Sequence, residues 1–201
     1  NIGKVIAIRK DLPSLLKAYA AAGSDARMNG CELPVVINSG SGNQGLTVSV
    51  PLIVYAEREH LDKEKLYRAL VISNLTAIHL KTEIGRLSAF CGAVSAGAAC
   101  GAGLAYLKDA SEEVMNHTIV NALAITSGII CDGAKASCAA KIAVSVEAGI
   151  LGYDMYMNGQ QFYGGDGIIS KGIENTIHNI GVLGSQGMAS TDQEIIKIMW
   201  E

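Results

Sequence analysis

The sequence has 201 residues and a net charge of −3, with 49% apolar and 17% charged residues. This length predicts one domain, residues 1–201, with enough apolar residues for a sizeable core. No run of basic residues is present, which argues against nucleic-acid binding. Five cysteines make an odd number, which favours free or metal-binding thiols in a reducing compartment, the cytoplasm, over disulfides.

The first forty residues hold the few strands that the sequence predicts. Residues 2–9 alternate loosely between apolar and polar and are expected to form a short strand. Asp11 and Pro13 are typical of a helix cap and first turn, and predict a helix that residues 23–25 end. Residues 31–38 are expected to form a short buried strand or extended segment.

A glycine-rich loop, Ser-Gly-Ser-Gly-Asn-Gln-Gly at residues 39–45, precedes the apolar residues 46–56. Consecutive amides beside small hydroxyls favour an anion-binding nest, and at a helix N-terminus they bind a carboxylate or phosphate. The loop matches neither a Walker loop nor a nucleophile elbow. On its own, an ordinary flexible turn is an equal alternative.

The rest of the chain predicts helices. Residues 87–107 carry no charge, but they are mostly small and weakly hydrophobic, which favours an interior helix or helix pair over a membrane span. The other helices are expected at about 62–82, 111–130, 135–148, 168–182 and 191–200. The expected fold is therefore mainly α: a multi-helix domain with a small-residue core and at most a few short strands near the N-terminus.

Three cysteines, Cys91, Cys131 and Cys138, follow a C-x39-C-x6-C pattern among small residues. Soft thiolates in weakly polar surroundings suit an iron–sulfur cluster. Structural zinc usually shows paired short spacings, which this chain lacks. The spacing alone leaves a zinc site or inert core thiols open. Cys31 and Cys100 are expected to be packing or accessory thiols.

Four segments together carry a resemblance to a known family. These are residues 38–45, the Phe90-Cys91-Gly92 turn, residues 130–138 (Ile-Cys-Asp-Gly-Ala-Lys-Ala-Ser-Cys) and residues 162–168. From about residue 38 onward the chain resembles the α-chain domain of iron–sulfur L-serine dehydratases, and most of all the branch with the L-cysteine desulfidases. Members of that family are longer, so we expect a further N-terminal region. No cysteine lies near the C-terminus to bind a fourth iron.

The resemblance implies a [4Fe–4S] cluster on Cys91, Cys131 and Cys138. It also implies β-elimination from a small amino acid, most closely L-cysteine giving pyruvate, ammonia and sulfide. The catalytic base is expected from the N-terminal region, which leaves this chain inactive alone. No membrane or nucleic-acid partner is expected, and the oligomeric state is open, a homo-oligomer included. The substrate carboxylate is assigned to Ser39, Gly40, Ser41, Gly42, Asn43 and Gly45.

Three alternatives remain at this point: an L-serine deaminase on the same site, a non-enzymatic iron–sulfur or redox-sensing domain, and a cluster-free helical assembly module. The cluster hypothesis predicts that the three sulfurs converge within about 6–7 Å of one another, given metal–thiolate bonds of about 2.3 Å. Cys31 and Cys100 are expected to lie outside that group.

Overall fold

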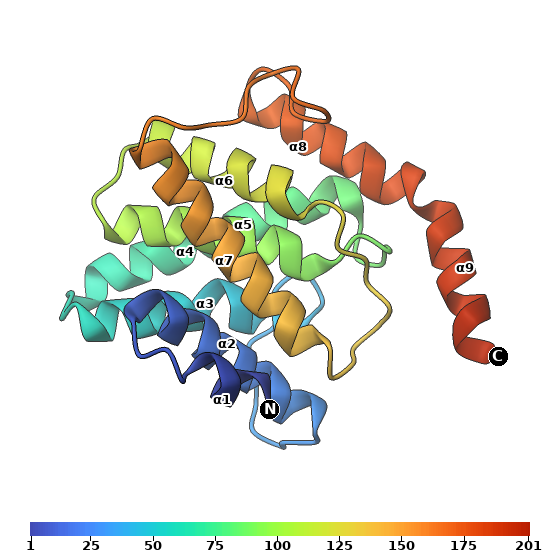
Figure 1. Ribbon diagram of the computed structural model, residues 1–201, viewed down its shortest axis with the longest axis horizontal. Helices are drawn as coiled ribbons and strands as arrows, with labels where there is room; N and C mark the ends of the chain where they lie inside the picture. Colours follow the sequence, from blue (N-terminus) through green and yellow to red (C-terminus); the bar gives the residue numbers. More distant parts are fainter.

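A computed structural model describes all residues, 1–201, as an assembly of helices without a single strand (Figure 1). Two isolated backbone bridges, Asn38–Ser41 and Phe90–Ile130, are the only β-type pairing. The mainly α, multi-helix prediction is confirmed. The elements are α1 (Ile2–Ile6), α2 (Leu12–Met28), α3 (Gly42–Arg58), α4 (Lys63–Ile84), α5 (Gly92–Leu107), α6 (Glu112–Thr126), α7 (Cys138–Met157), α8 (Ile173–Val182), the π-helical turn η1 (Leu183–Gly187) and α9 (Ala189–Trp200).

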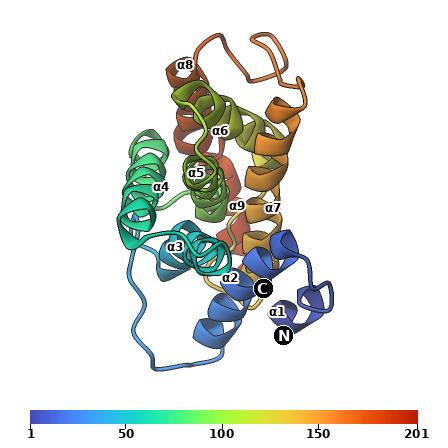
Figure 2. The same ribbon diagram turned by 90° about the vertical axis from the view of Figure 1, so that its left-hand side faces the viewer.

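Helix α5 forms the centre of the fold. Seen nearly end-on, it is surrounded by α3, α4, α6 and α7 (Figure 2), and it contacts all four. All of its residues are buried except Gly92 and Tyr106. A helix that is apolar on every side needs neighbours on every side, which explains why the uncharged segment is an interior helix.

Glycines allow α5 and α7 to approach closely. A Cβ added at Gly97 would lie 2.3 Å from the carbonyl oxygen of Ser145, and one at Gly101 would lie 2.8 Å from the Cα of Gly149. Real Cβ atoms do not approach that closely, so any side chain here would force the two helices apart. The expected small-residue core is thus a contact in which the backbones of α5 and α7 lie directly against each other.

Local capping signals predicted the starts of α2, α4 and α6. Asp11 Oδ1 accepts from the Ser14 amide at 2.9 Å, and Asp62 Oδ1 accepts from the Lys65 amide at 2.9 Å. Ser41 and Ser111 cap α3 and α6 in the same way. Each side-chain oxygen satisfies a first-turn amide that has no partner within the helix.

Both strands expected near the N-terminus are wrong. Residues 2–6 form the short helix α1, which packs through Ile2 and Ile6 against Ala21, Ala139 and Ala143. No partner strand is available to pair with this segment, and a helix satisfies its own backbone groups. Residues 31–38 are an irregular connection, largely exposed, that forms only the bridge at Asn38.

Several helix boundaries also differ from expectation. Helix α2 runs through residues 23–25 to Met28, because Gly23 fits against Leu46 and Asp25 accepts a hydrogen bond from the Gly3 amide. Helix α6 ends at Thr126, earlier than expected, while α7 continues past residue 148 to Met157. In α2, tertiary contacts therefore overrode a local helix-ending signal.

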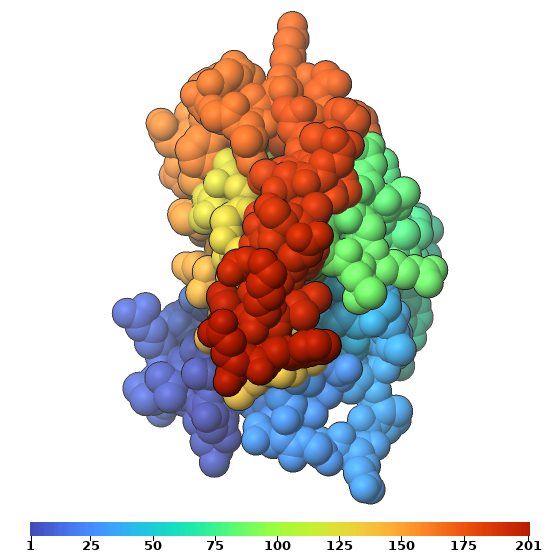
Figure 3. Space-filling model, turned by 90° about the vertical axis from the view of Figure 1, so that its right-hand side faces the viewer, coloured from blue at the N-terminus to red at the C-terminus, as the bar shows by residue number.

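The C-terminal helix α9 stands apart from the body of the protein. None of its residues is buried, and it contacts only η1. In Figure 3 it forms a separate ridge that crosses one face of the molecule. No helix of the protein, α9 included, combines the length and the hydrophobicity that crossing a membrane requires.

Candidate functional site

Three helices begin at one cavity of about 230 Å³. Ser41 is the N-cap of α3, Cys91 is the N-cap of α5, and Cys138 is the first residue of α7. All three residues line the cavity. Each helix N-terminus carries a partial positive charge and free amides, so the cavity favours anionic ligands.

Backbone pairing holds Cys91 next to Cys131. The Cys131 amide donates to the carbonyl of Ala89 at 2.6 Å, and the Cys91 amide donates to the carbonyl of Ile129 at 3.1 Å. The neighbouring Cys91 thiol lowers the pKa of Cys131 to about 6. The pKa of Cys91 rises correspondingly, and burial raises it further.

Cys138 lines the same cavity from the other end of a tight turn. Its Sγ accepts from the Lys135 amide at 3.4 Å and lies 3.7 Å from the carbonyl oxygen of Gly133. No group of three or more Cys, His, Asp or Glu side chains is arranged closely enough to hold a metal ion. Cys91, Cys131 and Cys138 thus share one cavity without forming a ready-made metal site, and their role as ligands stays a prediction.

The other two cysteines lie outside the cavity. Cys31 is exposed on the connection between α2 and α3, and Cys100 is buried within α5. Burial raises the pKa of the Cys100 thiol. Neither position offers a thiolate to the cavity.

Four of the six loop residues predicted to hold substrate line the cavity: Ser39, Gly40, Ser41 and Asn43. Ser39 and Gly40 have φ values of 49° and 86°, which turn the chain sharply into α3. The loop therefore lies at a helix start beside a cavity, as expected.

The remaining two glycines, Gly42 and Gly45, do not line the cavity. A Cβ at Gly45 would lie 1.8 Å from the carbonyl oxygen of Val36, and one at Gly42 would lie 2.8 Å from Arg27 Nε. The Gly45 amide already donates to the Ser41 carbonyl. Both glycines allow close packing, so their assignment to substrate contact rested on the motif and has no support from the geometry.

Lys81, Arg86 and Lys141 give the cavity positive charge, and no Asp, Glu or His lines it. Lys81 is only 5% exposed and forms no ion pair, and burial lowers its pKa. Burial also acts to lower the pKa of Lys141, but its ion pair with Asp132 and the thiols of Cys91 and Cys138 outweigh that and raise it. A buried lysine without a carboxylate partner is costly, which makes this cavity the candidate functional site.

Sequence reasoning missed these cations and Gln44, which also lines the cavity and whose Oε1 is buried without a partner. Signals for two of them were available. Lys81 follows Ala77 by four residues on the apolar face of α4, and Lys141 follows Cys138 by three residues on α7. Residues at these spacings share a helix face.

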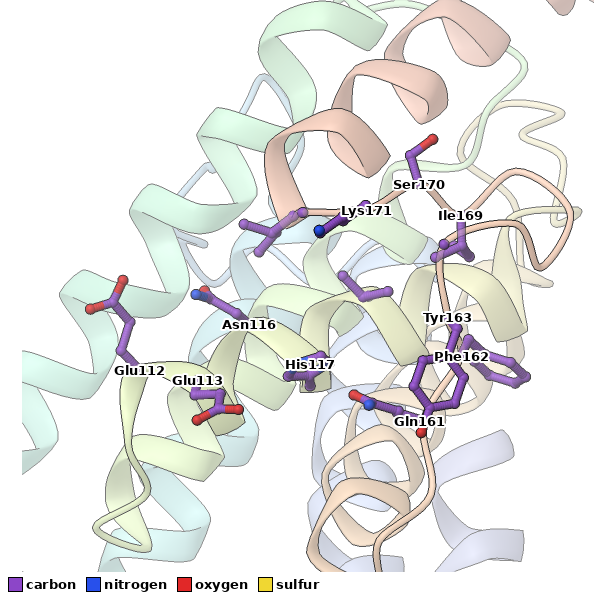
Figure 4. Close-up of a pocket in the computed structure, with 14 residues that line it drawn as sticks. Glu112, Glu113, Asn116, His117, Gln161, Phe162, Tyr163, Ile169, Ser170 and Lys171 are labelled. Atoms are coloured by element: carbon purple, nitrogen blue, oxygen red, sulfur yellow. The ribbon is translucent and has the colours of Figure 1, made fainter.

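A second, larger cavity of about 620 Å³ lies between α6 and the segments before α8 (Figure 4). Glu112, Glu113, Asn116 and His117 of α6 form one side of it. Gln161 to Gly164 and Ile169 to Ile173 complete the walls, so it includes part of the 162–168 segment but no cysteine. Its acidic and amide side chains suit neither a cluster nor the carboxylate of an amino acid.

Comparison with known proteins identifies the family of the chain. The family profile described as serine dehydratase alpha chain matches residues 1–197. The chain belongs to the serine dehydratase alpha chain family. The match begins at the first residue, so the similarity extends further than the region from residue 38 onward that carried the resemblance. No solved structure matches the chain.

The relatives are uncharacterised by name. The chain is 64% identical to a UPF0597 protein of Desulfitobacterium hafniense, over 99% of this chain and 47% of the relative. It is 53% identical to a UPF0597 protein of Finegoldia magna, over 100% of this chain and 48% of the relative. The chain thus spans about half the length of the curated relatives it matches.

Proposed function

We propose that the protein is an iron–sulfur lyase that performs β-elimination and deamination of a small amino acid, with L-cysteine as substrate and pyruvate, ammonia and sulfide as products. One observation carries the proposal: three thiols, three helix N-termini and three cations surround a single cavity that has no acidic lining residue. Membership in the serine dehydratase alpha chain family supports the class of reaction.

The type of donor atom, three thiols at one cavity, favours a [4Fe–4S] cluster. Cys91, Cys131 and Cys138 would hold it, because thiolates are the ligands such clusters prefer and no other soft ligand lines the cavity. The lowered pKa of Cys131 favours its thiolate, and the nearby Lys141 ammonium compensates negative charge. When bound on three thiolates, the cluster would supply one open iron as a Lewis acid for the leaving group.

The chain's own residues would bind and orient the amino acid. The substrate carboxylate would lie at the α3 N-terminus, near Ser39, Ser41 and Asn43, where the first-turn amides and the Ser41 hydroxyl would donate. Lys81 and Arg86, which also line the cavity, add positive charge. These contacts would fix the Cα–H and Cβ–S bonds in the orientation that elimination requires.

The reaction needs a proton acceptor for the Cα hydrogen. Since no Asp, Glu or His lines the cavity, we assign this group to the part of a full-length family member that lies outside these 201 residues. Lys81 is the competing assignment, because its lowered pKa leaves more of the neutral amine at a given pH. The enamine product then takes up a proton and is hydrolysed to pyruvate and ammonia.

Serine on the same site is the alternative substrate, with water in place of sulfide as leaving group. The test uses the full-length protein, meaning this chain together with the remainder that its relatives carry. After anaerobic reconstitution with iron and sulfide, L-cysteine should give equal amounts of sulfide and pyruvate, faster than L-serine gives pyruvate.

The same experiment separates the other classes of function. Faster turnover of L-serine would make the protein a serine deaminase. A thiolate-to-iron absorption band without turnover of either amino acid would favour a redox-sensing domain. Absence of the band would leave a helical assembly module.

A further inference from the structure

The outward face of α4 carries an apolar stripe with nothing packed on it. Tyr67, Val71, Leu75 and Ile78 follow one another at helical spacing and are 56%, 56%, 59% and 46% exposed. No charged residue lies between Arg68 and His79. The stripe is about 16 Å long at 1.5 Å per residue. Single exposed apolar residues are ordinary, but a continuous stripe of this length marks an interaction surface.

The connection before α3 extends this surface. The side-chain amide of Asn38 donates to the carbonyl oxygen of Asn74 at 3.2 Å and to Asn74 Oδ1 at 3.0 Å, which fixes the connection against α4. Val36 and Ile37 next to it are 79% and 65% exposed. Figure 2 shows α4 and this connection along the same side of the molecule. We call these six residues (Val36, Ile37, Tyr67, Val71, Leu75 and Ile78) the α4 face.

The α4 face continues to the rim of the cysteine cavity. Ile37 and Ile78 line a surface depression together with Ser39, Gly40, Lys81 and Arg86. The last four residues also line the cysteine cavity. A protein segment seated on the α4 face would therefore cover the depression and reach the cavity from outside.

The relatives indicate what this segment is. More than half of each matched relative lies outside the part that corresponds to these 201 residues. We propose that this remaining part of the full-length protein packs on the α4 face and closes the cysteine cavity. The further role of that part as source of the proton acceptor rests on the proposed function, whereas the packing itself does not.

The packing is tested by radical footprinting of side chains in two forms of the protein: these 201 residues alone and the full-length protein at a concentration where it is monomeric. Labelling of Tyr67, Val71 and Leu75 should fall at least five-fold in the full-length protein. Val144 and Leu151 on α7, which are 52% and 44% exposed, lie on a face interrupted by Glu147 and Asp154 and should be labelled equally in both forms.

Equal labelling of the α4 face in the two forms would overturn the proposal. Protection that appears only as the concentration rises would also overturn it, since a second copy of the chain would then be the occupant. Neither readout depends on turnover, so a protein that shows the expected protection but no lyase activity would contradict only the proposed function.

A pair of matched variants gives a second test. Val71→Glu and Val144→Glu each place a carboxylate at an exposed valine in the middle of a helix. Both should leave the melting temperature of the 201-residue chain unchanged. In the full-length protein, Val71→Glu should lower the melting temperature by several degrees and restore labelling of Tyr67, while Val144→Glu should do neither. Equal behaviour of the two variants in the full-length protein would refute the interface.

Discussion

The cavity on α6 and the cysteine cavity differ in the chemistry of their walls as well as in size. The larger, on α6, has carboxylates, amides and one lysine on its walls, whereas the smaller has three thiols, three cations and no carboxylate. Three helix N-termini meet at the smaller cavity. Volume therefore does not single out the candidate site in this protein. The sign of the charge and the type of donor atom single it out.

Loss of one of the three cavity thiols should have the largest effect. Replacing Cys91, Cys131 or Cys138 by Ser should abolish both the iron–sulfur absorbance and the turnover of the reconstituted full-length protein, because a hard hydroxyl is a poor iron ligand. Cys100→Ser should leave both largely intact, since Cys100 is buried outside the cavity. A reconstituted Cys138→Ser protein with full absorbance would remove Cys138 from the ligand set.

The Lys81→Met substitution should have the second-largest effect. Loss of a buried cation at the cavity should lower kcat/KM, chiefly through KM, by an amount that corresponds to about 2–5 kcal/mol of transition-state stabilisation. Lys81→Arg should restore part of this loss. The same Lys81→Met change should raise the melting temperature, because an unpaired buried charge is removed. Lys171→Met in the larger cavity is the matched control and should leave kcat/KM unchanged.

The Lys81 variants also distinguish the two candidate proton acceptors. If Lys81 itself removes the Cα proton, Lys81→Met should lower kcat with little change in KM. Lys81→Arg should then fail to restore activity. With Lys81 as the base, kcat should rise with pH as the lysine loses its proton, and Lys81→Met should remove this rise. Such a result would assign the proton acceptor to Lys81 of this chain.

Asn43→Ala should have a smaller effect. Loss of one polar contact to the substrate should lower kcat/KM by an amount that corresponds to about 1–3 kcal/mol of transition-state stabilisation. Asn43 Oδ1 also accepts from Arg27 Nη1 at 3.2 Å, so the melting temperature must be measured alongside. Asn116→Ala in the larger cavity should change neither quantity. An Asn43→Ala protein with unchanged kcat/KM would exclude the side chain from substrate binding.

The smallest effect concerns how the reactivity of the thiols in the metal-free chain depends on pH. The lowered pKa of Cys131 means that its thiolate is lost only below about pH 6, so its rate of alkylation should rise through that pH and level off above it. Cys100 should not react in the folded chain, because it is fully buried. A midpoint near 8.5, about the ordinary value for a thiol, would contradict the effect of the Cys91 thiol on the pKa of Cys131.

Much of the helical architecture could be predicted from the sequence because its causes are local. The caps at Asp11, Ser41, Asp62 and Ser111 act within one helical turn, and the uncharged, small-residue segment that becomes α5 can exist only inside the fold. The family motifs likewise identified the loop and the cysteines that lie at the cavity.

Other features were decided by contacts between residues distant in sequence. Ile2 and Ile6 form a helix because α2 and α7 offer an apolar surface, and α2 continues through Gly23 because Leu46 packs there. Such surfaces are built by several segments at once and leave no local signal.

The sequence by itself determined the mainly α class, the capped starts of α2, α4 and α6, and the chemical types available at the site. Tertiary structure alone decided that Cys91 meets Cys131 through the Phe90–Ile130 bridge, and that Lys81 is buried beside them without a carboxylate. The physical reason is that a cap or an apolar pattern is read within a few residues, whereas burial and the sharing of one cavity depend on how α3, α4, α5 and α7 pack around a common end.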